Sequence, residues 1–523
     1  MPSHWKCDFR PARRASRMDV RFRDTARTRR EQWRVWRCGS ASPAGLVTIA
    51  LCFVFACGCW GTKPAKDPST VVHPYRGQDV ELVVPSDLKL PTKWEVLLHE
   101  WEAETGATLR WTEYSAGETA SLGRVLHEAP LSGGRVIVFP LRELCDVDER
   151  LSPIEAATGL EFDPKDIFRG LRDRVVSRNR SPVAVPIAAP VLLCYYRADL
   201  LKAARLKPPE TWEEYLTLVE SLDRWAPGLV AVEPLGPTDR ATMFSARSLA
   251  YAKHPENYSF WFDLDTGESL ISSAGFIEAM EVASRTWKQM PPSIASMSLA
   301  DCRRAVLDGT AALAIAAEPT SSSATSASAT TRPSGAEIGV CRLPGSRRVF
   351  NGNSNRWEVP SDGAIHAPGL CGFDGLALGV SLPEGKAQHI AAQHLLSTLA
   401  SGQFETTWAS LPKSPCRESQ VGMAATWNAG GLSVEEASHA VDAAALTLRD
   451  PQLVADFPIP DAADFRRASG RCVEQVLKSE VEPRAAVEQL QAEFEKIITQ
   501  RGRDSLCAAY RRGLGLPPLD PSR

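Results

Sequence analysis

The stretch DVELVVPSDLKLPTKWEVLLHEWEAETG, residues 79–106, decides the fold. Residues 80–84 form an almost continuous apolar run, which is typical of a strand buried in a parallel sheet. The apolar residues that follow recur at i, i+3, i+4 and i+7, the spacing of an amphipathic helix: Trp94, Leu97, Leu98 and Trp101. Gly106 ends that helix. Because a strand followed by a helix is the unit of a doubly wound sheet, the stretch predicts an α/β protein.

Similar patterns continue along the chain. Residues 108–112 and 135–139 predict two more strands of the same sheet. Thr211 predicts a helix N-cap, with Glu214 three residues later as its capping-box partner. Further segments predict strands at 311–316 and 372–380, and helices at 275–287, 300–307 and 390–399, with a last helix after Pro483.

The N-terminal segment has a different character. Residues 1–43 contain twelve Lys or Arg against four acids, a net charge of +8, and the uncharged run Ala44–Trp60 follows with seventeen residues. That run is shorter than the about 20 apolar residues of a membrane-spanning helix. A basic segment before a short apolar one is typical of a secretory signal. An uncleaved anchor is the alternative, and Met18 is a second candidate start of the chain.

The end of the apolar run resembles a bacterial lipobox, with Ala56 or Gly58 at its small position. The resemblance implies that Cys57 or Cys59 carries the lipid and becomes the mature N-terminus, so that residues 1–59 are leader. Residues 60–77 are polar and contain prolines, which predicts a solvated linker. The chain is therefore expected outside the cytoplasm, in the periplasm or at the cell surface, tethered to the membrane.

Charge and cysteine usage restrict the function of the exported part. With the basic leader removed, the whole-chain charge of −3 becomes about −11, which argues against nucleic acid as a partner because phosphate contacts need a basic face. The eight remaining cysteines contain no C-x-x-C pair, so neither a zinc site nor a dense disulfide framework is predicted. One or two disulfides are compatible with an oxidising compartment, but their pairing is open.

The order of these elements resembles the extracellular solute-binding proteins of bacterial ABC importers, in the sugar-binding, maltose-binding-protein-like branch. The segments that carry the resemblance are residues 80–85, 104–106, 185–187, 194–201, 209–215, 308–313 and 342–345. The resemblance implies a periplasmic-binding-protein-like fold of two α/β lobes joined by a multi-strand hinge, with a helical C-terminal region. Ligand would bind between lobes that close by hinge motion.

The resemblance also implies domain boundaries. Lobe 1 is expected over residues 78–188 plus 345–405, and lobe 2 over 189–340 plus 406–515, with crossings near 186–190 and 340–344. The Ser/Thr-rich tract within 320–334 predicts a flexible surface loop, because its polar composition cannot bury enough apolar surface to order itself.

Several candidate ligand-binding residues follow the predicted strands of lobe 1, because open α/β sheets bind ligands beyond the carboxyl ends of their strands. They are Ser86 and Asp87, then Trp111, Glu113 and Tyr114, then Arg142 and Glu143. A structural salt bridge is the alternative for Arg142 and Glu143. The apolar segment 188–190 lacks the acid that maltose-binding relatives carry after this crossing, which departs from their contact pattern.

Aromatic residues supply further candidates, since sugar rings stack on aromatic planes. Tyr258, Trp261 and Trp357 lie in predicted loops, and Phe373 and Asp374 lie in a glycine-flanked turn where the backbone can approach a ligand closely. Core packing is the alternative for the Tyr258 and Trp261 group. The relatives carry an aromatic residue near the position of Glu318, where the Ser/Thr-rich tract of this chain begins. Tyr258 and Trp261 are candidates to take its place.

No catalytic motif of the hydrolase, nucleotide-binding or zinc-protease type occurs in the sequence. Together with the resemblance, this predicts a non-enzymatic, monomeric protein without cofactor or metal. The resemblance implies that it binds a small solute, expected to be a mono- or oligosaccharide, and delivers it to ABC transporter permease subunits. A lipoprotein with this fold but no transport role, and a carbohydrate-active enzyme, are the alternatives. The identity of the solute is not determined by the sequence.

Overall fold

The computed structural model describes residues 73–519 with gaps at 89–91, 116–121, 123–125, 127–133, 155–161, 319–331, 361, 383–384, 402–414 and 423–430. The described residues belong to one compact unit that starts at Val71. The predicted lipid-bearing residues Cys57 and Cys59 and the Ser/Thr-rich tract at 320–331 lie outside them. Within the described part, no helix is both long and apolar enough to cross a membrane.

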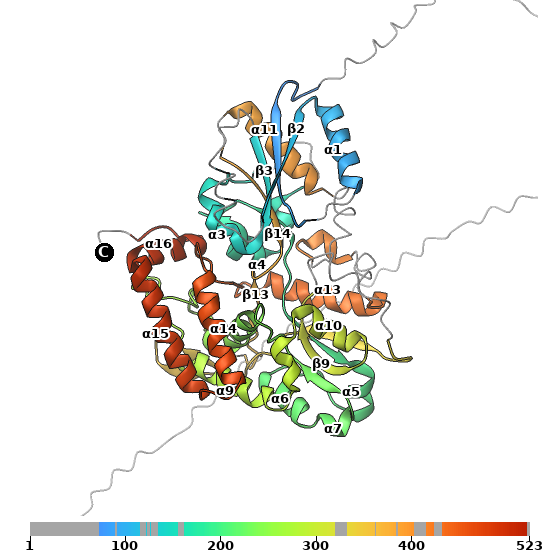
Figure 1. The fold of residues 1–523 in the computed structure, drawn as a ribbon, viewed down its shortest axis with the longest axis vertical. Coiled ribbons are helices and arrows are strands. Elements are labelled where there is room, and N and C mark those ends of the chain that lie inside the picture. Colours follow the sequence, from blue (N-terminus) through green and yellow to red (C-terminus); the bar gives the residue numbers. More distant parts are fainter. Residues whose placement is uncertain are drawn as a thin grey trace, which may run out of the picture. The chain divides into compact units, whose positions relative to one another are not determined.

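The first sheet contains five strands in the order β2-β1-β3-β14-β6 (Figure 1). The predicted strands are confirmed as β1 (Asp79–Pro85), β2 (Thr108–Tyr114) and β3 (Gly134–Pro140), with β1 parallel to both neighbours. The antiparallel strand β14 (Leu376–Val380) lies between β3 and β6 (Val185–Ala188). The apolar runs are buried, and all seven residues of β3 are inaccessible or nearly so.

Among the described residues, helices α1 (Thr92–Thr105) and α11 (Lys386–Leu399) pack on this sheet. The predicted stripe of α1 is buried at Trp94 and Trp101, which are 0% and 3% exposed. The indole Nε1 of Trp101 donates a 3.0 Å hydrogen bond to Nδ1 of His394 on α11. This bond joins the two helices through their buried faces.

The second sheet has the order β10-β7-β9-β8. Its strands are β7 (Leu193–Arg197), β8 (Val230–Val232), β9 (Ala311–Ala316) and β10 (Ile338–Arg342). The alanine-rich β9 is fully buried, as its apolar sequence predicts. Helices α5 (Ala198–Ala204), α10 (Leu299–Leu307) and α13 (Val434–Arg449) pack on this sheet.

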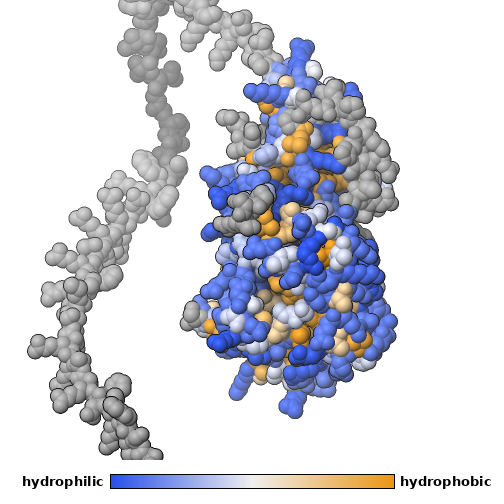
Figure 2. All heavy atoms as spheres, turned by 90° about the vertical axis from the view of Figure 1, so that its left-hand side faces the viewer, coloured by the Kyte–Doolittle hydropathy of each residue, from blue (hydrophilic) through white to orange (hydrophobic). Residues whose placement is uncertain are grey.

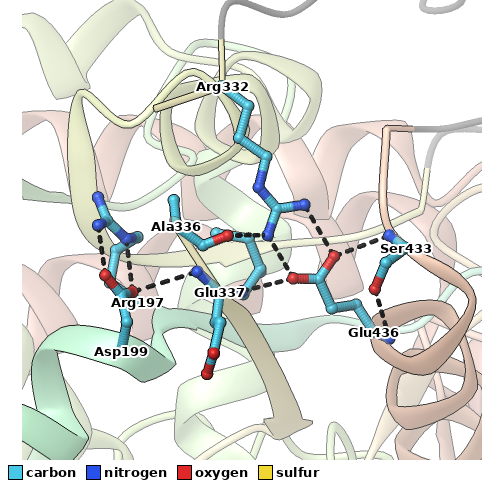
Figure 3. Close-up of polar contacts among 8 residues, drawn as sticks. Arg197, Asp199, Arg332, Ala336, Glu337, Ser433 and Glu436 are labelled. Carbon is cyan, nitrogen blue, oxygen red and sulfur yellow. Dashed lines mark hydrogen bonds and ion pairs between the residues drawn. The ribbon is translucent and has the colours of Figure 1, made fainter. Parts of the chain in front are cut away.

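An ion pair ties β10 to α13. The guanidinium of Arg332 binds the carboxylate of Glu436, which also accepts a hydrogen bond from the backbone N–H of Ile338 (Figure 3). Glu436 closes a capping box with Ser433 at the start of α13. The Glu436 carboxylate thus binds the segment before β10, the backbone of β10 and the N-terminus of α13.

A group of helices lies beside the second sheet: α6 (Trp212–Glu220), α8 (Arg240–Ala252), α9 (Ala274–Trp287), α14 (Ala463–Leu477), α15 (Pro483–Arg501) and α16 (Arg503–Gly513). The predicted N-cap of α6 is confirmed, since the Thr211 side chain accepts from the backbone of Glu214. The C-terminal helix α14 packs on both α8 and α15. Figure 2 shows the face of the molecule on the side of α15 and α16, which is mainly hydrophilic with smaller apolar areas.

The remaining elements are short. The helical ones are η1 (Leu141–Glu143), α3 (Leu144–Val147), η2 (Asp148–Arg150), η3 (Pro164–Asp166), α4 (Arg169–Leu171), η4 (Arg172–Val176), α7 (Leu222–Trp225) and η5 (Pro292–Ser296). The strands are β4 (Ser177–Arg178), β5 (Ser181–Pro182), β11 (Val349–Asn351), β12 (Arg356–Glu358), β13 (Leu370–Cys371) and β15 (Val454–Ala455).

The chain passes from the first sheet to the second between β6 and β7, at residues 189–192. Gly345 pairs with Thr211, and β11 packs on α8 and α9, so this segment contacts the second group of elements. The lobe boundaries stay a prediction, and we propose that residues 345–369 belong with lobe 2. The strand expected at 372–380 starts only at Leu376, because Gly372 and Gly375 adopt positive φ in a turn.

Candidate functional site

A cavity of ≈ 1010 Å³ lies where three parts of the chain meet. The first is η1 and α3, which follow β3 directly, so the carboxyl end of a central strand of the first sheet leads into the cavity wall. The second is the segment 237–242 at the start of α8. The third comprises residues 459–474, at the start of α14, together with residues 501–509.

The lining of this cavity is rich in charge and has no aromatic ring among the described residues. Its cations are Arg142, Arg240, Arg466, Arg467, Arg471 and Arg501. Its acids are Glu143, Asp146, Asp461, Asp464 and Glu474. Hydroxyl groups come from Thr238, Thr242 and Ser505. Such a lining favours hydrogen bonds and ion pairs with a solute over stacking against its ring faces.

Two of the arginines have unused donor capacity. Arg142 is exposed at the start of η1, and no described residue pairs with its guanidinium. Arg240 is 6% exposed, and its Nη1 lies 2.8 Å from Oε2 of Glu474, but its Nε is buried without a hydrogen-bond partner. A buried donor without a partner costs free energy, so Arg240 has hydrogen-bonding capacity that its described neighbours leave unused.

The other lining arginines are fixed by ion pairs or backbone carbonyls. Nε of Arg466 lies 2.8 Å from Oδ2 of the buried Asp456, and Arg501 donates to the carbonyl oxygen of Pro460 at 2.9 Å. Nη2 of Arg471 lies 2.7 Å from Oε2 of Glu493 on α15. These pairs hold the arginines in place beside the cavity.

Two partly buried carboxyls at or next to the cavity have raised pKa values. Burial raises the pKa of Asp146 to about 6, and the nearby carboxylates of Asp461 and Glu143 add to this effect. Burial likewise raises the pKa of Asp239, next to the lining residue Arg240, to about 6, with a further contribution from the carboxylate of Asp374. The charge of the cavity therefore changes between pH 5 and 7.

The structure brings four of the sequence candidates close to one another. Arg142 and Glu143 line the cavity. The Tyr114 hydroxyl donates a 2.9 Å hydrogen bond to the carbonyl of Val138, and burial raises its pKa with contributions from the carboxylates of Glu143 and Asp87. The Tyr114 hydroxyl thus lies within electrostatic range of the carboxylates of Glu143 and Asp87.

The other candidates on the first sheet do not line the cavity. The backbone N–H of Ser86 donates to the carbonyl of Tyr114 at 2.8 Å, which continues the β1 and β2 ladder. Trp111, 40% exposed, and Glu113, also exposed, lie on the edge strand β2.

The aromatic candidates contact protein groups away from the cavity lining. The hydroxyl of Tyr258 donates to the carbonyl of Leu514 at 3.0 Å. Trp261 is 0% exposed and stacks on Phe457 with ring centroids 3.8 Å apart, so it belongs to the core. Trp357 lies under the guanidinium of Arg348, whose Cζ is 4.4 Å from the ring centroid.

The last two candidates lie in the turn before β14. Phe373 is 7% exposed, and Oδ1 of Asp374 accepts from the backbone N–H of Gly375 at 2.8 Å. The carboxylate of Asp374 contributes to the raised pKa of Asp239, which adjoins the lining residue Arg240. Asp374 itself does not line the cavity, and Phe373 packs inward.

The sequence interpretation missed the cavity walls formed by residues 237–242 and 459–474. Their charged residues have the spacing of a solvated helix face. The sequence pattern of these segments therefore does not differ from that of other surface helices. The run Gly236-Pro237-Thr238-Asp239 before α8 was the one signal that marked a helix start at this position. Among the described residues, no group of three or more His, Cys, Asp or Glu is arranged to hold a metal ion.

Comparison by sequence gives no match, either to a family model or to a curated protein. Comparison of structures gives many matches. A MalE sugar-binding protein from Xanthomonas citri aligns with a TM-score of 0.59 at 18% identity, over 81% of this chain and 98% of its own. A maltose-bound MalE3 from T. maritima aligns with a TM-score of 0.55 at 16% identity, over 80% and 100% of the two chains.

A ribitol-bound ABC transporter solute-binding protein from Agrobacterium radiobacter K84 aligns with a TM-score of 0.52 at 18% identity, over 81% of this chain and 100% of its own. At these identities the comparisons establish the fold. The resemblance inferred from the order of sequence segments is confirmed at that level. The protein has the periplasmic-binding-protein-like fold of the maltose- and sugar-binding proteins of ABC importers.

Proposed function

We propose that this protein is an extracytoplasmic solute-binding protein, which captures a small solute in the cavity between η1, α8 and α14 and delivers it to an ABC importer. The observation that carries the proposal is the position of the cavity. It lies beyond the carboxyl end of β3, where open α/β sheets place their ligands. The basic leader and short apolar run support export, and a lipid on Cys57 or Cys59 would tether the protein.

The cavity chemistry supports a polar, hydroxyl-bearing solute that also carries an acidic group, such as a uronic acid or a sugar phosphate. Arginine guanidinium groups bind carboxylates and phosphates through paired donors. The unpaired Arg142 and the incompletely paired Arg240 offer such donors. Carboxylates such as Glu143 accept hydrogen bonds from sugar hydroxyls. The described lining residues offer charged and hydroxyl groups but no aromatic ring on which a sugar face could stack.

A thermal-shift screen of the mature chain tests the proposal. Monosaccharides, oligosaccharides, polyols, hexuronates and sugar phosphates should be compared at equal concentration. A solute present at about 100 times its Kd stabilises the folded state by about 2.7 kcal/mol, so it raises the Tm. We expect acidic sugars to give the largest increase, and the solute to be recovered chemically unchanged. Turnover of the solute would instead support an enzyme.

A further inference from the structure

Two cysteines of the second sheet lie directly opposite each other. Cys194 on β7 is the register partner of Cys341 on β10, in an antiparallel pair. The neighbouring Cys341 thiol, together with burial, raises the pKa of Cys194. Among the described strands they are the one pair of cysteines in register, since the third strand cysteine, Cys371, is opposite Ala455.

The backbone already meets the distance requirement of a disulfide. The N–H of Ala198 donates to the carbonyl of Glu337 at 2.8 Å, and these residues continue the register of the cysteine pair by four positions. Hydrogen-bonded and non-hydrogen-bonded pairs alternate in an antiparallel ladder, so Cys194 and Cys341 form a hydrogen-bonded pair with Cα atoms about 5.5 Å apart. Disulfides span Cα distances of about 4.4–6.8 Å.

The two thiols differ in accessibility. Cys194 is 0% exposed, whereas Cys341 is partly exposed. An external oxidant can therefore reach the sulfur of Cys341 first, and Cys194 is placed to attack it from within the sheet. This arrangement of one accessible and one buried thiol is typical of a pair that oxidises through a mixed disulfide.

We propose that Cys194 and Cys341 form a reversible disulfide in the exported protein. The step rests on an oxidising compartment, and its oxidant is a small-molecule or protein disulfide. The Cys341 thiolate attacks one sulfur of that disulfide and releases the first thiolate. The Cys194 thiolate then attacks the Cys341 sulfur and releases the second. Two thiols lose their protons and are oxidised, and one disulfide is reduced to two thiols.

The bond would link β7 and β10 close to the place where the chain enters β7 from the first sheet, at residues 189–192. It would also close the long loop from Cys194 to Cys341, which contains α8, α9 and β9. Closing a long loop restricts the unfolded chain and so stabilises the fold. Strain at a hydrogen-bonded pair makes a disulfide easier to reduce.

The test treats the full exported chain with oxidised glutathione, without any solute, and maps cysteine peptides under non-reducing conditions by mass spectrometry. We expect one linked peptide that joins Cys194 to Cys341, a mass about 2 Da lower than that of the reduced chain, and a Tm higher by about 5 °C. Cys341→Ser should abolish all three effects. The matched control Cys302→Ser, at another buried thiol, should retain them.

Both cysteines recovered as alkylated thiols after unfolding of the oxidant-treated chain would overturn the proposal, as would linkage of either one to a different cysteine. The substitution at the partly exposed Cys341 avoids the packing change at Cys194. Because no solute is present, failure of the disulfide leaves the binding proposal intact, and failure of solute binding leaves this result unaffected.

Discussion

Oδ1 of Asp146 accepts a 2.7 Å hydrogen bond from the backbone N–H of Asp461. The bond joins the segment after β3 to the segment before α14, so it fastens two walls of the cavity to each other. Asp461 has a left-handed backbone with φ of 51°. A second link forms nearby, where Nη1 of Arg512 on α16 lies 2.5 Å from Oε1 of Glu149.

The pKa of Asp146 makes solute affinity depend on pH. Its value of about 6 means that the carboxyl gains a proton between pH 7 and pH 5. The cavity becomes more positive as it does so, and an acidic solute should bind more tightly at pH 5, provided its own acid stays ionised. Calorimetric titration with a hexuronate at both pH values measures this difference.

The control for that experiment is Asp146→Asn, which keeps an acceptor for Asp461 but cannot titrate. It should bind an acidic solute more tightly at pH 7 than the unaltered protein does at that pH, and show a weaker dependence on pH. Asp239, with a similar pKa, accounts for the remaining dependence. Tighter binding at pH 7 than at pH 5 would be incompatible with an anionic solute.

Arg142 should contribute to binding but not to stability, because it is exposed and has no partner among the described residues. Charge-assisted hydrogen bonds contribute about 1.5–3 kcal/mol. Arg142→Ala should therefore weaken acidic-solute binding about 10- to 100-fold and leave the Tm unchanged. The matched control is Arg224→Ala, at an exposed position on α7, which should alter neither. If the two variants bound the acidic solute with equal affinity, Arg142 would not be part of the binding site.

The Glu233 carboxylate should be essential for stability. It is 0% exposed, lies 2.5 Å from Nη2 of the buried Arg247 and accepts from the indole of Trp287 at 2.8 Å. Glu233→Gln leaves the arginine charge buried without its counter-ion, which should lower the free energy of unfolding by about 3–5 kcal/mol. Urea unfolding followed by tryptophan fluorescence measures the loss.

The matched control for that variant is Glu220→Gln. Its ion pair with Arg285 is 3.9 Å long and both side chains are exposed, so the loss should be under about 1 kcal/mol. Similar losses in the two variants would show that burial of the Glu233 pair has no special energetic role.

Glu436 should make the fold sensitive to acid. Hydrogen bonds from Arg332, Ile338 and Ser433 outweigh the effect of burial and lower its pKa from 4.5 to about 2 (Figure 3). The native state holds the ionised form, so this stabilisation is fully present above pH 4.5 and is lost as the pH falls toward 2. A shift of this size corresponds to about 3 kcal/mol, which screening by solvent reduces to about 2 kcal/mol.

Unfolding free energies at pH 3 and pH 7 test this linkage. The difference between them should be smaller in Glu436→Gln than in the unaltered protein, with most of the change appearing as lower stability at pH 7. Glu418→Gln, which removes an exposed partner of Arg449, serves as the control and should leave the difference unchanged. An unaltered pH dependence in Glu436→Gln would contradict the lowered pKa.

Local sequence patterns predicted much of the fold for clear physical reasons. Buried strands need apolar runs, so residues 80–84 and 311–316 were found as β1 and β9. The Thr211 cap and the α1 tryptophans follow from hydrogen bonding and periodicity, which act over a few residues. The segment order then led to the fold that the structural comparisons support.

The binding site was harder to predict from local sequence patterns than the fold. Arg142 and Glu143 were found because they follow a recognisable strand, but Arg240 and Arg466 reach the same cavity only through tertiary packing of α8 and α14. The loop aromatic Trp261 turned out to be enclosed by core rings. A sequence shows that a residue is in a loop, but not which distant segment will cover it.

The central claim is that one small solute binds in the cavity lined by Arg142 and Arg240. Isothermal titration of the unaltered protein and of Arg142→Ala, with the solute that gives the largest Tm increase in the screen, tests it most directly. The account predicts saturable binding of one solute per chain that weakens at least about tenfold in the variant. No saturable binding of any screened solute, or the same Kd in both proteins, would contradict it.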